Sequence, residues 1–219
     1  MIPIHLFIAA FLLSIVDKIK AKKDYKASFN QYARVDIVAG KTGSGKSFSA
    51  LNEMINFKKK YPLGIIFSNM AVSLVDGPLS LDVFYTQFDV PVLIVVDEAN
   101  STYRAQLKSD LPKELRDTLM QIRKGIGKRV ILLTQDYTLL DTSFRKLAHY
   151  VFETKTYFGR LTSYRRFEQQ TYEAQYSSGG IDFDKSAKKL RRQSFWLLQT
   201  AKVRAMYDFK AIVDTDWAK

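Results

Sequence analysis

Four short apolar runs occur in the middle of the chain, with stretches of helical periodicity around them. The runs lie at residues 35–39, 64–69, 91–96 and 129–135. Continuous apolar runs of this length are typical of parallel strands that are covered on both faces. Helices are predicted at residues 48–55, 79–88, 113–124 and 143–147. Because strands joined by crossover helices form parallel sheets, the pattern predicts an α/β fold with a mainly parallel sheet.

The pattern changes in the last third of the chain. Residues 150–158 and 161–174 alternate in polarity and are rich in aromatic and β-branched side chains, with Gly159 and Arg160 between them. These features predict a β-hairpin with a tight turn. The basic stretch at 184–208 is predicted to contain helices. We therefore divide the chain into three parts: residues 1–33, 34–152 and 153–219.

The N-terminal part begins with an apolar stretch at residues 2–16, followed by five lysines between positions 18 and 26. A secretory signal carries its positive charge before the apolar stretch, which is the reverse order. Two interpretations remain. The stretch is an N-terminal membrane anchor with the lysines on the cytoplasmic side, or it is a helix packed on the domain or on a neighbouring subunit. The lack of a polar face favours the anchor.

The strongest chemical signal directly follows the first predicted strand. Residues 40–47 match the pattern G-x-x-x-x-G-K-[ST]. Glycines let the backbone curl so that successive N–H groups point inward, and the next helix adds its positive N-terminus. Lys46 is expected to reach the β- and γ-phosphates of ATP, and the Ser47 hydroxyl to bind Mg²⁺. The candidate nucleotide-binding residues are Gly40, Lys41, Thr42, Gly43, Ser44, Gly45, Lys46 and Ser47.

Polar side chains end two of the other predicted strands. Asp97 and Glu98 follow the apolar run at 91–96, and Gln135 ends the run at 129–135. Ligands bind at the carboxyl ends of the strands in open α/β sheets. We expect Asp97 to hold the Mg²⁺ shell, Glu98 to orient the attacking water, and Gln135 to lie beside the γ-phosphate. Glu98 directly after Asp97 favours an ATPase that activates water over a nucleotide kinase.

Composition adds one constraint on partners. The 219 residues carry a formal net charge of +12, contain no cysteine and only two histidines. Disulfides are therefore excluded and a zinc site is disfavoured. The excess charge indicates a polyanionic partner, nucleic acid or an anionic membrane, or simply a basic soluble protein. Arginines alternate with aromatic residues along the predicted hairpin, which suits either a nucleic-acid surface or an ordinary hairpin with one wet face.

Taken together, these motifs resemble a known family. The core from about Val35 to Phe152 resembles the FtsK/HerA superfamily of P-loop ATPases, which places it in the RecA-like ASCE class. Within that superfamily the chain looks most like the Zot-like (zonular occludens toxin-like) assembly ATPases of filamentous phages. Small viral DNA-packaging ATPases of the same superfamily are close competitors. The resemblance rests on the stretches at 67–69, 97–100, 120–125, 133–135, 140–141 and 207–208.

The resemblance implies an ATP-hydrolysing motor that forms a homo-oligomeric, hexamer-like ring. Such a motor moves viral DNA independently of its sequence, either packaging it or extruding it during virion assembly, and it contacts other virion or capsid proteins. The resemblance implies that the motor is located at the cytoplasmic face of the host membrane, or at the virion membrane or packaging vertex. An arginine from a neighbouring subunit commonly completes such a site. The candidates are Arg104, Arg145 and, preferred among them, Arg123.

A second class of function stays open at this point. The chain is alternatively a membrane-anchored P-loop ATPase that acts on protein partners, or an assembly scaffold that uses ATP as a structural ligand. The adjacent carboxylates Asp97 and Glu98 argue against the scaffold. Stimulation of turnover by DNA separates the motor from the alternative.

Overall fold

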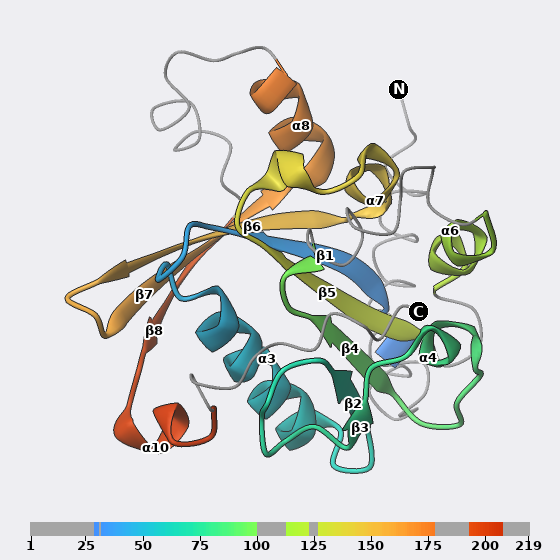
Figure 1. Cartoon of the computed structure of the whole chain (residues 1–219), viewed down its shortest axis with the longest axis horizontal. Coiled ribbons are helices and arrows are strands. Elements are labelled where there is room, and N and C mark those ends of the chain that lie inside the picture. The colour runs from blue at the N-terminus through green and yellow to red at the C-terminus, as the bar shows by residue number, and fades with distance from the viewer. Residues whose placement is uncertain (1–28, 31, 100–112, 123–126, 178–192, 208–219) are drawn as a thin grey trace, which may run out of the picture.

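The computed structural model describes residues 29–30, 32–99, 113–122, 127–177 and 193–207. These residues form one eight-stranded sheet with the order β3-β2-β4-β5-β1-β6-β7-β8 (Figure 1). The strands are β1 (Arg34–Ala39), β2 (Ile65–Ser68), β3 (Gly77–Pro78), β4 (Val92–Val96), β5 (Lys128–Thr134), β6 (Tyr150–Tyr157), β7 (Leu161–Glu168) and β8 (Gln193–Leu198). The first six in spatial order pair in parallel, and β7 and β8 pair antiparallel.

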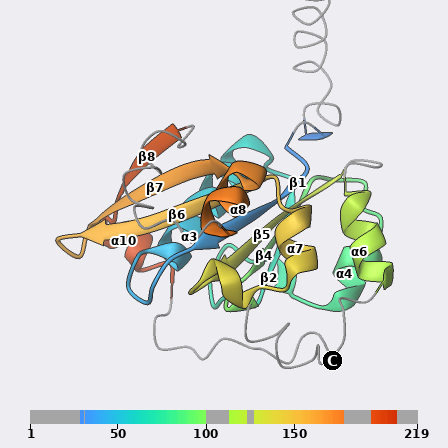
Figure 2. The same cartoon turned by 90° about the horizontal axis from the view of Figure 1, so that it is seen from above.

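Helices cover both faces of the sheet and define two apolar cores. On one face lies α3 (Lys46–Lys60), which buries Leu51 and Met54 against β1, β4 and β5. The other face carries α4 (Leu81–Tyr85), α6 (Lys113–Met120), α7 (Thr142–Leu147) and α8 (Gln169–Ser177). Figure 2 shows α7 and α8 lying together beside the sheet. The parallel pairing of the first six strands confirms the expected α/β class and the mainly parallel sheet. The central strands β4 and β1 are buried almost throughout.

The C-terminal part differs from the sequence prediction in two places. The hairpin forms, but its second strand ends at Glu168, and α8 replaces the predicted continuation to residue 174. The stretch at 184–208, predicted to contain helices, includes the strand β8 and only one short helix, α10 (Ala201–Arg204), in its described residues. The predicted division after residue 152 falls inside β6, which pairs with β1 from Tyr150 to Glu153. The hairpin therefore continues the sheet of the core.

Within the described part of the chain, no helix has the length and apolar character needed to cross a bilayer. The apolar stretch at residues 2–16 lies outside the described residues.

Candidate active site

The loop between β1 and α3 has the curled backbone that its glycines predict. Gly43 and Gly45 adopt positive φ angles of 78° and 93°, a region that other residues rarely enter. The helix α3 begins at Lys46, and no described side chain caps its N-terminus. The first N–H groups of α3 therefore point toward the loop and remain available to an anion.

Three threonines of β6 and β7 lie against this loop, and we call them the threonine wall: Thr154, Thr156 and Thr162. The hydroxyl of Ser44 lies 2.8 Å from that of Thr154, and the Thr156 hydroxyl donates to the Ser44 carbonyl at 2.9 Å. A Cβ atom on Gly45 would lie 2.6 Å from the hydroxyls of both Thr156 and Thr162. Gly45 is therefore required twice, for its φ angle and for this close approach. The phosphate-binding loop is held in shape by the hairpin strands.

Ser47 and Asp97 meet at the carboxyl edge of the sheet, as predicted. The Ser47 hydroxyl donates to Asp97 Oδ2 at 3.2 Å. Two oxygens at about this spacing suit neighbouring ligands of an octahedral Mg²⁺ ion. Burial raises the pKa of Asp97, with the charge of Glu98 adding to the effect, while the N–H of Glu98 and the Ser47 hydroxyl oppose it. A bound cation fits this buried carboxylate because it would balance the negative charge.

Lys46 lies in the same place and is almost fully buried. Its ammonium donates to the Lys41 carbonyl at 3.3 Å, so the side chain folds back over the loop. Burial lowers the pKa of Lys46, and the charges of Glu98 and Asp97 act against this shift. The lysine thus lies between the loop and the two carboxylates that follow β4.

Asn69 fixes the backbone of the acidic strand end. Its side-chain amide donates to the Asp97 carbonyl at 2.9 Å, and its oxygen accepts from the Asp97 N–H at 2.7 Å. This paired contact reproduces one rung of a ladder at the end of β2, where the strand itself stops at Ser68. Asn69 therefore positions the residues that follow β4.

Glu98 has an unusual backbone and a directed side chain. Its φ angle is +49°, a left-handed conformation that costs roughly 1 kcal/mol or more in a residue with a side chain. The Gln135 amide donates to both carboxylate oxygens of Glu98, at 3.1 and 3.2 Å. The strained turn after Asp97 thus aims the Glu98 carboxylate at Gln135, the residue directly after β5.

A cavity of about 510 Å³ opens beside the loop, on the side of Gln135. Its walls come from the phosphate-binding loop, the segment after β5, and the strands β6 and β7, with α8 closing one side. The lining residues that matter for the chemistry are Gly40, Lys41, Gln135, Glu153, Lys155 and Arg165. The site therefore has room for a ligand that extends from the loop toward the hairpin.

Comparison with known proteins identifies the family. The model for zonular occludens toxin (Zot) matches residues 71–204, more than half of the chain. The chain belongs to the Zot family. Among curated proteins, no sequence matches this chain. The Zot match begins after the phosphate-binding loop, so the loop geometry above is an independent observation.

Comparison with solved structures bears on the fold. The N-terminal domain of zonular occludens toxin from Neisseria meningitidis is similar with a TM-score of 0.54 and 17% identity, covering 80% of this chain and 99% of that domain. The genome-packaging NTPase B204 of Sulfolobus turreted icosahedral virus 2, in complex with ATP-gammaS, is similar with a TM-score of 0.45 and 14% identity, covering 63% and 93%. The fold of the Zot-family chain is that of a P-loop NTPase.

The structure of this Zot-family chain describes only one of the three candidate arginines, Arg145. Arg104 and the preferred Arg123 lie outside the described residues. Arg145 bonds to Glu173 at 3.0 Å and to Thr142 at 3.1 Å. Arg145 is therefore engaged within its own subunit.

Three features of the site were missed in the sequence. Asn69 was noted only as part of the family resemblance. The threonine wall and the place of Arg165 depend on how β6 and β7 register against β1. The alternation of Thr154 and Thr156 was a usable signal, since residues two apart in a strand share a face.

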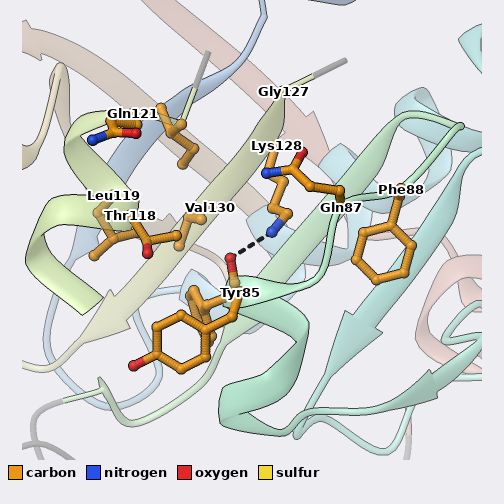
Figure 3. A pocket seen from close by; sticks show the side chains of 11 residues that line it. Tyr85, Gln87, Phe88, Thr118, Leu119, Gln121, Gly127, Lys128 and Val130 are labelled. Atoms are coloured by element: carbon orange, nitrogen blue, oxygen red, sulfur yellow. Dashed lines mark hydrogen bonds between the residues drawn. The ribbon is translucent and has the colours of Figure 1, made fainter. Parts of the chain in front are cut away.

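A second, smaller cavity lies at the opposite edge of the sheet. It measures about 150 Å³ and is enclosed by the end of α4, by α6 and by the start of β5. Figure 3 shows Lys128 pointing into it, beside Gln87 and Phe88. The Lys128 ammonium donates to the Phe84 carbonyl, and burial lowers the pKa of Lys128 to about 8.

Proposed function

We propose that this Zot-family chain hydrolyses ATP. The observation that carries the proposal is the convergence of Lys46 and Ser47 with Asp97 and Glu98, from two separate segments, at one open loop. Lys46 and the loop amides would hold the phosphates, and Ser47 and Asp97 would hold Mg²⁺. When bound, Mg²⁺ neutralises charge that develops on the phosphate oxygens.

In this proposal the chain's own carboxylate activates the water. Glu98 accepts a hydrogen bond from the attacking water and orients it in line with the terminal phosphate. Gln135 holds the Glu98 carboxylate through both of its oxygens. The left-handed turn at Glu98 keeps this arrangement in place before the substrate arrives.

We further propose that hydrolysis drives an oligomeric ring that moves viral DNA during packaging or phage assembly. Membership of the Zot family and the net charge of +12 support this step. A basic chain that grips phosphates would bind DNA independently of sequence. Partners of this motor would include other virion or capsid proteins, and its place would be a host or virion membrane, with residues 2–16 as the contact.

The test is an ATPase assay on the full chain with no DNA, with single-stranded DNA and with duplex DNA, over a range of salt concentrations. We expect turnover, stimulation by one DNA form, and loss of that stimulation as salt rises. Glu98→Gln is the matched control for contaminating activity. An absence of Glu98-dependent turnover contradicts the enzyme proposal. Turnover that no DNA changes contradicts only the DNA step.

The apolar stretch and its lysines favour one alternative. A membrane-anchored ATPase that acts on protein partners would use the same site without DNA. Turnover that responds to vesicles with anionic lipids, and not to DNA, supports this alternative over the motor.

A further inference from the structure

Arg165 lies in the cavity beside the phosphate-binding loop. It belongs to β7 and stands opposite Glu153 of β6 in the antiparallel ladder. Opposite residues of a ladder share a face of the sheet, and both side chains line the 510 Å³ cavity together with Gly40 and Lys41. The hairpin thus brings an arginine to the nucleotide site of its own subunit.

Within the described part of the chain, the guanidinium of Arg165 has no hydrogen-bonding or ion-pair partner. The obvious candidate is Glu153, but its carboxylate accepts a hydrogen bond from the Tyr172 hydroxyl at 3.0 Å. Among the residues that the structure describes, the Arg165 side chain forms no hydrogen bond and no ion pair, although it is half-buried. A half-buried arginine without a partner is suited to an anionic ligand, and planar guanidinium matches phosphate oxygens well.

The other lining residues indicate which part of a nucleotide lies nearby. Gly40 and Lys41 begin the phosphate-binding loop, and Gln135 holds the Glu98 carboxylate. Glu98 is the group assigned to the attacking water, so the cavity opens on the side of the terminal phosphate. Lys41 and Lys155 add positive charge to the same cavity.

We propose that Arg165 binds the terminal phosphate of ATP within the same subunit, so that the hairpin distinguishes ATP from ADP. The proposal deepens the hydrolytic function above and rests on nucleotide binding at this loop. It also gives the hairpin a direct link to the nucleotide, in addition to the threonine wall. The wall extends further, since Gln199 beyond β8 donates to the Thr162 hydroxyl at 3.0 Å.

The first experiment compares nucleotide affinities of the full chain. Arg165→Ala is expected to weaken binding of a non-hydrolysable ATP analogue by about 10- to 100-fold, the usual effect of losing a hydrogen bond to a charged group. Binding of ADP should change by less than about threefold, because ADP lacks the phosphate concerned. Arg165→Lys should recover part of the affinity, since the charge is kept and the planar geometry is lost.

Arg166→Ala is the matched control. Arg166 is the next residue of β7, points to the opposite face and lies 4.7 Å over the Tyr150 ring. We expect it to bind both nucleotides like the wild-type chain. Equal weakening of the analogue and ADP by Arg165→Ala, or no weakening of either, overturns the proposal. Thermal melting and circular dichroism of the apo variants separate either result from misfolding.

A mixing experiment tests whether Arg165 acts in its own subunit. Arg165→Ala and Lys46→Ala chains are combined before the ATPase assay. The assay uses an ATP concentration too low for the Arg165→Ala chain to bind. If Arg165 serves its own subunit, neither chain then turns over ATP and mixing restores no turnover. If Arg165 reaches a neighbouring site, the mixture recovers activity and the same-subunit assignment is overturned. A wild-type chain that binds but never hydrolyses ATP contradicts the proposed function, while the affinity comparison still decides the role of Arg165.

Discussion

Lys46 and Lys128 are both buried lysines, and they lie at opposite edges of the same sheet. Burial lowers the pKa of both side chains. At the carboxyl edge, Lys46 has Asp97 and Glu98 near it, and these charges act to keep it protonated. At the amino edge, the Lys128 ammonium contacts the Phe84 carbonyl and the Phe88 ring.

The two lysines differ in their neighbours and not in residue type, and the neighbours indicate which of them belongs to the candidate active site. Lys46 stands among groups that are each suited to a nucleotide: loop amides, a hydroxyl and two carboxylates. Lys128 lies in a pocket where its charge has a desolvation cost that one carbonyl only partly offsets. The comparison predicts that changes at the first edge alter chemistry, and that changes at the second alter stability.

The largest effect is expected from Lys46→Ala. Removing the cation from the loop should reduce ATP turnover by about 1000-fold or more, because the transferring phosphate loses a fixed positive charge. Steady-state ATPase assays measure this, with Lys128→Met as the control from the other edge. Near wild-type turnover in Lys46→Ala would contradict the claim that Lys46, unlike Lys128, is needed for catalysis.

Glu98→Gln should reduce turnover by roughly 100-fold or more while ATP binding is kept. The amide retains the size of the side chain and loses the ability to accept the water's proton. Isothermal titration with ATP and a single-turnover assay separate the two effects. An active Glu98→Gln enzyme would exclude this carboxylate from the reaction.

Lys128→Met should stabilise the fold at pH 7 by about 1–3 kcal/mol without changing turnover. The folded-state pKa of Lys128, about 8, is below its ordinary value of 10.5. Below pH 8 Lys128 is protonated in both the folded and the unfolded state, so the cost of burying its charge is fully present. Above about pH 10.5 Lys128 is neutral in both states, and the stability difference between the variant and the wild type disappears.

The measurement is urea unfolding of wild type and Lys128→Met at a series of pH values from 7 to about 10. The difference in unfolding free energy should shrink steadily above pH 8. A constant difference would mean that packing, and not charge, sets the cost of Lys128.

Thr156→Val should have the smallest effect, a loss of stability of about 1 kcal/mol and a modest rise in the KM for ATP. Valine keeps the shape and removes the hydroxyl that bonds to the Ser44 carbonyl and meets Thr162. Thr138→Val, in the exposed segment after β5, is the control. Unchanged KM and melting temperature would show that the loop holds its shape without the wall.

The sequence predicted best where the relevant residues are close together in the chain. The phosphate-binding loop, its strand and its helix form one continuous segment, so glycine spacing alone located them. The meeting of Ser47 with Asp97 was also predictable, because parallel strands place their ends at one edge. The oxygens that meet come from residues 50 positions apart.

The failures occurred where contacts between distant segments decide the outcome. The stretch after Glu168 was predicted to continue the strand, yet Gln169 and Tyr172 are buried three positions apart, as in a helix. β8 follows a basic stretch, and its strand conformation comes from pairing with β7. Arg165 could be recognised as a charged hairpin residue, but its place in the cavity depends on a register that local pattern does not give.

The strand β6 continues past residue 152, where the predicted core segment ends, and this affects how the protein can be truncated. A fragment trimmed to the motif-bearing segment keeps Lys46, Asp97, Glu98 and Gln135, and would pass as an intact enzyme by inspection of its motifs. It would nevertheless leave one side of the phosphate-binding loop open to solvent, because the hydroxyls that support the loop come from positions 154–162. A fragment that keeps every contact of this support therefore extends at least to Gln199.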